Sequence, residues 1–488
     1  MLRIFYLSII ILFTTLLTVN TRGHLALAQE PHQWANVERI PNYDDAAEPP
    51  FMIADQNRTV HAFSSETIDS DAYYLIYRQW SLEEGWTDPI DIFARNPKPF
   101  GLFMDDAGSV HLAFYRGTEV QADVYYSTAK IADIAQGLGA RAWSQEKLVA
   151  QDAGPFAFGH IIGDGKNNIF ILFEGKGEGN GLYSIHSSDG GNTWSEPITI
   201  SLTYDEERWA TRMSLTMDPQ GAVHAVWAEW SSAGVGVDIR YAKLAPDYTE
   251  WSKPIVLAEK DPEDYEADNP AIIYFNKELI VVYQDDFPAT KAMRTSFDGG
   301  QTWSEPVIPW PHKGEYGQAN LLVDSNNTLH IILGNRAGDD AHGMWHGVWL
   351  ENRWSELEPI VTGPKTLQFD PTEPTAVISQ GNILLATWDH DSPDPENGIW
   401  YSYTELDAPE LPVVPLPTVT VLTSAPTVTP IPTLVPSTPS HRPATPIAIH
   451  ESNLGTISST PSLPLMLSLI PVSLIIAAVF VVIRLNHR

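Results

Sequence analysis

Short apolar runs recur along the chain at intervals of about 50 residues, and each is followed by an aromatic run. Each repeat reads as a strand, a turn of the D-x-x-G kind, a strand such as V-H-A-x-W, an aromatic strand and a segment of the type W-S-x-P-I. Four-stranded repeats of this length are typical of β-propeller blades, whereas the repeats of a linear β-solenoid, the alternative, are usually shorter. The second strands are expected to begin at Val60, Val110, Ile169, Val223, Leu279, Leu329 and Ile383.

The seventh repeat lacks a fourth strand, because the chain continues after Glu405 into a proline-rich segment. The missing strand is predicted near the beginning of the chain, where Trp34 in WANVERIP lies one repeat length before Trp86. We therefore expect an all-β propeller of seven blades, with six as the alternative, closed by residues 33–41 as the outer strand of the last blade. The other fourth strands are expected to open with Trp86, Trp143, Trp194, Trp251, Trp303 and Trp354.

Both ends of the chain carry apolar segments. Residues 1–28 contain an early cation, an apolar run and a final Ala-Leu-Ala, which predicts a signal peptide that is cleaved after Ala28. Residues 463–483 are uncharged and long enough to cross a hydrocarbon layer of ~30 Å as a helix, and the cations in residues 484–488 place that tail in the cytoplasm. A retained N-terminal anchor and a GPI signal are the alternatives at the two ends.

Residues 408–462 are rich in proline and threonine and poor in charged residues. Such a segment cannot bury a core and favours extended polyproline II conformations, which predicts a disordered stalk. The order of these segments predicts that the propeller, residues 29–407, is displayed at the cell surface and joined by the stalk to a single-pass membrane anchor.

Composition excludes several classes of function. The chain has 61 acidic and 29 basic residues, a formal net charge of −32, whereas a nucleic-acid partner requires a basic surface. It has no cysteine, which excludes disulfides, thiolate metal sites and a cysteine nucleophile.

Two turns between third and fourth strands read SSDGGNTW and SFDGGQTW. In such a turn the Asp accepts backbone N–H groups, glycines adopt positive φ, and the Trp packs between adjacent sheets. These turns resemble the Asp-box, and over residues 33–406 the chain is similar to the sialidase/neuraminidase superfamily of BNR-repeat propellers. The resemblance implies a structural role for the boxes, on the face opposite to the ligand. Their residues are Ser187, Asp189, Gly191, Thr193, Trp194, Ser296, Asp298, Gly300, Thr302 and Trp303.

The resemblance also implies a catalytic site of three arginines that bind a sugar carboxylate, an Asp acid/base, and a Tyr nucleophile activated by a Glu. Residues 38–41, ERIP, are similar to the first arginine motif, but the repeat register places Arg39 in the ring-closing strand. For every other candidate, a solvated loop charge or an ion pair between blades is the alternative. The candidates are Arg116, Arg212 and Arg336 with Arg208 nearby, Tyr316 beside Glu315, and Asp69, Asp71 or Asp285.

Acidic loops with aromatic residues are predicted on the ligand face, in residues 203–212, 259–269 and 388–397. Aromatic rings stack on sugars, and carboxylates accept hydrogen bonds from hydroxyls or hold Ca²⁺. A solvated acidic rim is the alternative. The candidate substrate-binding residues are Trp209, Tyr204, Tyr265 and Trp388.

Four histidines occupy the same position in four repeats, directly after the first residue of the second strand. A ring distributes such residues around its circumference, so they are expected to pack within their own blades and not to share a metal ion. We expect no metal site beyond Ca²⁺ on the acidic loops, and no other cofactor. These histidines are His61, His111, His224 and His330.

Two functions are consistent with these patterns. The first is a glycan-binding or protein-binding module at the cell surface, and the second is a hydrolase of the exo-sialidase type that removes a terminal acidic sugar. The first is favoured, because no arginine motif lies in register and the acidic face would repel an anionic sugar unless an arginine cluster opposed it.

Overall fold

The computed structural model describes residues 31–44, 47–69, 72–93, 97–117, 122–154, 158–203, 208–260, 266–285, 290–311, 317–335, 342–364, 366, 369–390 and 397–414. The chain divides into the units Met1–Val421 and Leu422–Arg488, and all of these residues belong to the first. The predicted signal peptide, most of the stalk, the membrane segment and the tail lie outside the described residues. Within the described ranges, no helix has the length and apolar character needed to cross a bilayer.

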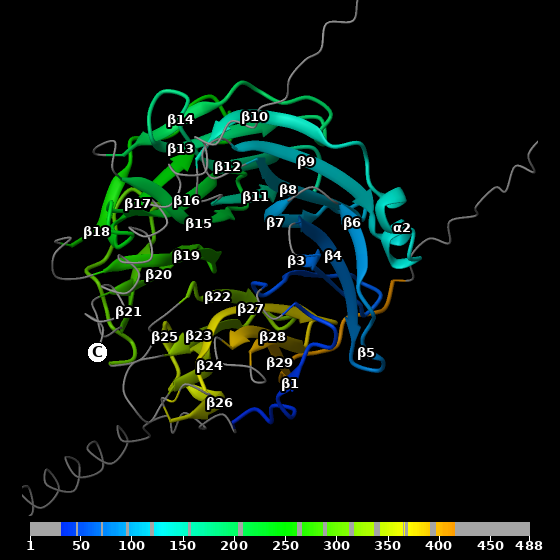
Figure 1. Ribbon diagram of the computed structural model, residues 1–488. Helices are drawn as coiled ribbons and strands as arrows, with labels where there is room; N and C mark the ends of the chain where they lie inside the picture. The colour runs from blue at the N-terminus through cyan, green and yellow to red at the C-terminus, as the bar shows by residue number, and fades with distance from the viewer. Residues whose placement is uncertain are drawn as a thin grey trace, which may run out of the picture. The chain divides into compact units, whose positions relative to one another are not determined.

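The first unit consists of antiparallel hairpin-linked strands arranged in sheets around a central opening (Figure 1). Strands that follow one another along the chain also pair with one another, as expected when each repeat folds locally. The strands of the first three repeats are β2 (Phe51–Ala54), β3 (Val60–Asp69), β4 (Ala72–Ser81), β5 (Gly85–Trp86), β6 (Ile90–Phe93), β7 (Lys98–Met104), β8 (Ser109–Gly117), β9 (Ala122–Lys130), β10 (Lys147–Ala153), β11 (Gly159–Gly163), β12 (Ile169–Gly175), β13 (Gly181–Ser187) and β14 (Ile198–Leu202). The later strands are β15 (Trp209–Met217), β16 (Val223–Trp230), β17 (Gly236–Leu244), β18 (Ile255–Glu259), β19 (Ala267–Phe275), β20 (Glu278–Asp285), β21 (Thr290–Ser296), β22 (Asn320–Val323), β23 (Leu329–Asn335), β24 (His342–Leu350), β25 (Arg353–Trp354), β26 (Glu358–Gly363), β27 (Pro371–Ser379), β28 (Ile383–His390) and β29 (Gly398–Glu405).

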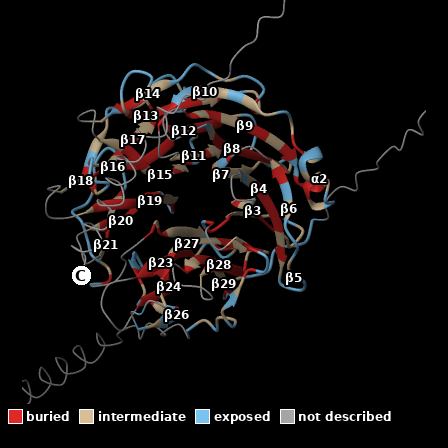
Figure 2. Cartoon of the chain, in the orientation of Figure 1, coloured by how far each residue is buried: buried red, intermediate tan, exposed pale blue. Residues whose placement is uncertain are grey.

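Helical structure in the described ranges is confined to the segment after β9, with α2 (Ile131–Ala135) and a 3-10 turn (Gly139–Ala142). The prediction of a mainly β fold is therefore confirmed. Burial follows the order of strands within each sheet (Figure 2). Every residue of the middle strand β12 is buried, whereas the outer strands β6, β10, β18 and β26 alternate between buried and exposed positions. The core therefore lies between neighbouring sheets, as the continuous apolar runs of the middle strands require.

The N-terminal segment completes the sheet of β27, β28 and β29. Its strand β1 (Glu38–Arg39) pairs with β29 in the register Glu38 to Tyr401. Two further backbone hydrogen bonds flank the strand, from Ala35 N to Tyr403 O at 2.8 Å and from Ile40 N to Ile399 O at 2.8 Å. The predicted pairing of residues 33–41 with the last aromatic strand is confirmed.

The tryptophans of the W-S-x-P-I segments begin the pairing with the third strands, as predicted for the start of the fourth strands. Trp86 and Trp354 lie in β5 and β25, and Trp143 and Trp251 form single bridges to their third strands. The ladder is then interrupted and resumes at Ile90 after Trp86, and at Ile198 after Trp194. Where the segment contains a proline, its missing N–H contributes to the interruption. The indole of Trp194 packs between sheets, edge-on to the Tyr126 ring with centroids 5.0 Å apart.

Three of the four repeated histidines form the same buried arrangement. The Nε2 atom of His224 lies 3.3 Å from a carboxylate oxygen of Asp218 in the D-x-x-G turn, and its Nδ1 lies 2.7 Å from the Tyr241 hydroxyl. Each histidine thus joins the turn to the third strand of its own sheet, as predicted. The equivalent sets are His61 with Asp55 and Tyr77, and His111 with Asp105 and Tyr126.

The buried His224 ring makes stability depend on pH. Burial lowers the pKa of His224 to about 4, although the hydrogen bond with Asp218 opposes the shift. Between pH 6.5 and pH 4 the unfolded chain therefore binds a proton at this histidine that the folded chain does not bind. The contribution of His224 to the free energy of unfolding is therefore complete above pH 6.5 and is lost as the pH falls toward 4.

We expect the free energy of unfolding to fall by about 1.4 kcal/mol per pH unit for this histidine across that window. Urea denaturation of the chain and of His224→Gln, each at pH 7 and pH 4.5, measures the difference. Equal pH dependence in the two proteins would contradict this prediction.

Candidate functional site

Three inner strands, β15, β19 and β27, carry the same irregularity near their first residues. In each, two residues oppose one residue of the neighbouring strand, which is the geometry of a β-bulge. The first bulge residues Arg212, Asn269 and Glu373 have φ angles of 46°, 50° and 46°. Left-handed backbone is strained for such residues, and bulges re-aim side chains next to functional sites. Because these strands end at the turns that lead into the second strands of their repeats, the bulges near their beginnings lie on the opposite face, at the mouth of the ring.

Arg212 and Glu373 form an ion pair although their strands belong to different sheets. Arg212 Nη2 lies 3.2 Å from Glu373 Oε1, and both side chains keep 28% of their surface exposed. The guanidinium carbon is also 5.1 Å from the centre of the Phe158 ring and 5.8 Å from that of Trp230. Aromatic rings and a carboxylate therefore fix the orientation of the guanidinium while part of it stays accessible.

Two further carboxyl groups near Arg212 have raised pKa values. Burial raises the pKa of Asp268, and the charge of Arg212 and a 3.0 Å hydrogen bond from Trp230 Nε1 oppose the shift. Glu48 is exposed as a residue, but partial desolvation of its carboxyl and the charge of Glu373 raise its pKa, and the charge of Arg212 opposes this shift. A carboxyl group with a raised pKa can keep a proton and donate it to a ligand oxygen.

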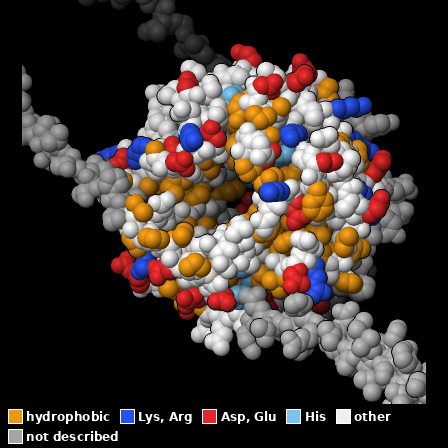
Figure 3. Space-filling model, turned by 180° about the vertical axis from the view of Figure 1, so that it is seen from behind, with side chains coloured by type: hydrophobic (Ala, Val, Ile, Leu, Met, Phe, Trp, Pro, Cys, Tyr) orange, Lys and Arg blue, Asp and Glu red, His pale blue; other side chains and the backbone are white. Residues whose placement is uncertain are grey.

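We call Arg212, Glu373, Asp268, Glu48 and Trp230 the mouth cluster. Its carboxylates can accept hydrogen bonds from sugar hydroxyls, its guanidinium can donate hydrogen bonds to sugar oxygens, and its indole offers a surface on which a sugar ring can stack. Figure 3 shows the central opening from the face turned away in Figure 1, with hydrophobic side chains along its border and most acidic and basic side chains farther out.

Two grooves lie elsewhere, between neighbouring sheets. One, of about 320 Å³, is lined by β1 and β29 and by residues 80–85. The other, of about 680 Å³, is lined by β10 and by the Asp-box turn after β13. Both are formed by outer strands, so they lack the bulged inner strands that distinguish the mouth cluster.

No known family profile and no curated protein matches the sequence. Solved structures match its fold. An ulvan lyase of polysaccharide lyase family PL25, solved bound to -[GlcA(1-4)Rha3S]-, has a TM-score of 0.51 at 12% identity, over 77% of this chain and 96% of its own. A protein of unknown function from Dyadobacter fermentans has a TM-score of 0.47 at 16% identity, over 77% and 99%. The NanB sialidase from Streptococcus pneumoniae has a TM-score of 0.40 at 9% identity, over 77% and 71%.

The fold is a β-propeller, as in the ulvan lyase. This confirms the propeller fold that the repeats and the Asp-box motifs predicted. In the propeller, Asp189 Oδ1 accepts a hydrogen bond of 2.8 Å from the backbone N of Thr193, and Oδ2 accepts one of 2.7 Å from its hydroxyl. These hydrogen bonds lower the pKa of Asp189 to about 2. The second box has the same bonds from Thr302 to Asp298, so both boxes hold their turns closed.

The described arginine candidates pair with different carboxylates. Arg116 Nη2 lies 2.8 Å from Glu146 Oε1, and its guanidinium lies over the rings of Phe114 and Tyr125. Arg208 Nη1 lies 3.4 Å from Asp238 Oδ2. Of the described candidates, Arg212 is the one that belongs to the mouth cluster, and each arginine has a carboxylate partner of its own.

Several predicted residues lie outside the described ranges, namely Arg336, Tyr316, Glu315, Asp71, Tyr204 and Tyr265. Among the other acid/base candidates, Asp69 is the last residue of β3, and Asp285 forms an ion pair of 2.8 Å with Lys260.

The two described tryptophans proposed for substrate binding differ in placement. Trp209 begins β15 on the mouth face, where Lys176 Nζ lies 5.4 Å from its ring centre. Trp388, by contrast, is only 2% exposed and packs in the core with Leu384 and Met344. Its indole therefore stabilises the contact between sheets and presents no face to a sugar, which corrects the sequence interpretation.

The sequence interpretation did not select Glu373, Asp268, Glu48 or Phe158. One local signal was available: the second bulge residue is Pro270 in β19 and Pro374 in β27, and a proline within a predicted strand indicates a bulge. It also expected no metal site in the blades, yet within the described ranges His32, His346 and Glu358 bring three potential ligand atoms to within 4.8 Å of one another.

Proposed function

We propose that this protein is a glycan-binding module of the cell surface that takes a sugar chain at the mouth cluster. In this proposal a seven-bladed propeller, residues 29–407, is held outside the cell by the proline-rich stalk and a single-pass anchor. The observation that carries the proposal is the set of bulges that turn Arg212 and Glu373 toward the mouth of the ring. Strained backbone of this kind persists where it serves a site.

The charge of the mouth cluster supports a hydroxyl-rich ligand over a strongly anionic one. One guanidinium, that of Arg212, faces the carboxyl groups of Glu373, Asp268 and Glu48. Carboxylates accept hydrogen bonds from sugar hydroxyls, but they repel a sugar carboxylate unless several cations outweigh them. The similarly folded ulvan lyase was solved bound to -[GlcA(1-4)Rha3S]-, which supports a saccharide as the ligand class here, whereas the preference for a neutral saccharide rests on the mouth cluster alone.

A second candidate is a glycoside hydrolase, of which the exo-sialidase type is the form that the motifs suggest. The raised pKa values of Asp268 and Glu48 favour it, because a protonated carboxyl beside an ionised one is the pair that glycosidases use. The binding module remains the main proposal, since the described arginines do not form a clamp.

The purified full-length chain separates these functions in two assays. On a glycan array we expect binding to neutral, hydroxyl-rich glycans, and in fluorogenic assays we expect no release of fluorophore from a sialoside or from neutral glycosides. Release from the sialoside would establish the hydrolase instead. Absence of binding to every immobilised glycan, together with absence of turnover, would refute both functions.

A further inference from the structure

One repeat departs from the buried arrangement of Asp, His and Tyr. Where three other sheets place Tyr77, Tyr126 and Tyr241, strand β24 has His346. Its Nε2 lies 2.9 Å from His330 Nδ1, which is the contact that the tyrosine hydroxyl makes elsewhere. A tyrosine ends at that hydroxyl, whereas an imidazole carries a second nitrogen. The substitution therefore adds one metal-ligating atom, Nδ1, at a buried position.

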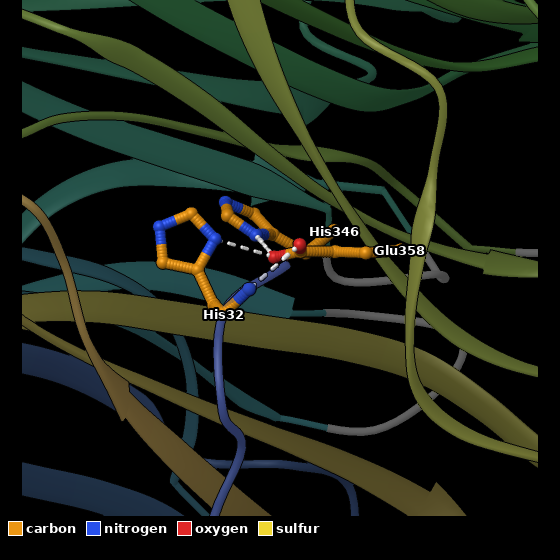
Figure 4. Close-up of side chains that lie close together, drawn as sticks. All are labelled: His32, His346 and Glu358. Carbon is orange, nitrogen blue, oxygen red and sulfur yellow. Dashed lines mark hydrogen bonds and ion pairs between the residues drawn. The ribbon is translucent and has the colours of Figure 1, made fainter. Parts of the chain in front are cut away.

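The Nδ1 atom of His346 faces Glu358 of β26 and His32 of the N-terminal segment (Figure 4). His346 Nδ1 lies 2.5 Å from Glu358 Oε1, and His32 Nδ1 lies 2.7 Å from the same oxygen. The side chains of His346 and His32 are 0% and 6% exposed, and that of Glu358 is 18% exposed. Three ligand atoms thus converge at a site that is mostly closed to solvent.

We propose that His32, His346 and Glu358 bind a divalent transition-metal ion, with Zn²⁺ the best match. Two imidazoles and one carboxylate are a common zinc set, in which a water takes the fourth position. Tetrahedral ligands at about 2.0–2.1 Å from zinc lie roughly 3.3 Å apart, so the present nitrogen-to-oxygen distances must widen by less than about 1 Å.

The surroundings of His346 match those of a metal-ligating histidine. With Nδ1 on the metal, its Nε2–H donates to His330, whose own Nε2 lies 3.2 Å from Asp324 Oδ2. Such outer hydrogen bonds fix the tautomer and the orientation of the ligating ring. The aspartate at this position, which supports a tyrosine through the histidine in three other sheets, supports a metal ligand in this one.

The proposed ion would join the N-terminal segment to a sheet that this segment does not complete. His32 lies six residues before β1, which pairs with β29, whereas His346 and Glu358 belong to β24 and β26 of the neighbouring sheet. The Trp34 ring of the same N-terminal segment also packs edge-on to His346, with ring centres 5.7 Å apart. The metal therefore cross-links the N-terminal segment to the neighbouring sheet at the point where the ring closes, and this site is separate from the mouth cluster.

The test uses the full-length chain without a polyhistidine tag, freed of metal with a chelator and titrated with Zn²⁺ by calorimetry. We expect one equivalent to bind and the unfolding temperature to rise. Co²⁺ added instead should give the visible absorption of a tetrahedral site. His346→Tyr restores the residue found in three other repeats, so it should fold but bind Zn²⁺ with affinity reduced by more than the roughly 10–100-fold expected for an outer-shell change.

Two further variants complete the test. Glu358→Gln keeps the size of the side chain and removes the anionic ligand, so it should also abolish tight binding, and it serves if His346→Tyr does not fold. His186→Gln, in a different sheet, should bind as the unaltered chain does. Equal Zn²⁺ binding by the unaltered chain and Glu358→Gln, or no saturable binding by the unaltered chain, would show that these residues form a hydrogen-bonded cluster only.

Discussion

Replacement of Arg212 by glutamine is expected to lower the affinity for the glycan ligand by about 10–100-fold. Arg212 supplies the guanidinium of the mouth cluster, and a hydrogen bond to a charged group contributes about 1.5–3 kcal/mol. Without this guanidinium, Glu373 loses its ion-pair partner. The pKa values of Glu48 and Asp268 should rise further, because the charge of Arg212 no longer lowers them. Calorimetry with the best glycan of the array measures the change.

Arg116→Gln is the matched control for this substitution. It removes the same charge and hydrogen-bonding group, but from an ion pair with Glu146 in a sheet away from the mouth cluster. Its glycan affinity should stay within about twofold of the unaltered chain, because surface ion pairs contribute little. Similar losses in both variants would mean that net charge, and not the mouth cluster, governs binding.

Replacement of Gly300 by alanine is expected to destabilise the propeller by about 2–5 kcal/mol. Gly300 has a φ of 85°, and a Cβ atom there would lie 1.8 Å from the hydroxyl oxygen of Tyr241. That hydroxyl is held by His224, so it cannot move without loss of the buried arrangement. Chemical denaturation of the two proteins gives the difference in the free energy of unfolding.

The neighbouring Gly299→Ala change separates backbone strain from the steric clash. Gly299 also has positive φ, 69°, but the nearest atom to its Cβ is the flexible amine of Lys243 at 3.2 Å. We expect a cost of about 1–2 kcal/mol, from the left-handed conformation alone. If Gly300→Ala cost no more than Gly299→Ala, the contact between the Asp-box and Tyr241 would have no part in stability.

The strands and the ring closure were predictable because they depend on local patterns. Continuous apolar runs identify the buried middle strands, and a repeat without its last strand implies a partner at the other end of the chain. Trp34 marks that partner by its spacing alone. The tryptophans correctly mark where each fourth strand starts to pair, but the interruption that follows them depends on backbone geometry that the pattern does not show.

The mouth cluster was less predictable, because it depends on contacts between distant residues. Arg212 and Glu373 are 161 residues apart, and no periodicity links their strands. Arg212 was selected as a candidate for its place at the start of an inner strand, but its partner was not. His32 and Glu358 are likewise 326 residues apart, and His346 stands where three other repeats have a tyrosine.

The two-residue strand β1 also has a consequence for the order of folding. Glu38 and Tyr401 are 363 residues apart, so their pairing requires the closure of a very long loop and cannot occur until β29 has been synthesised. From its synthesis until β1 pairs with it, β29 has an unpaired edge to which another chain could add a strand. Strand β1 has only two residues, Glu38 and Arg39, and both are charged, so it pairs poorly with the edge strands of other molecules. The pairing of β1 with β29, which closes the ring, is therefore formed last, although β1 is the first strand of the propeller to be synthesised.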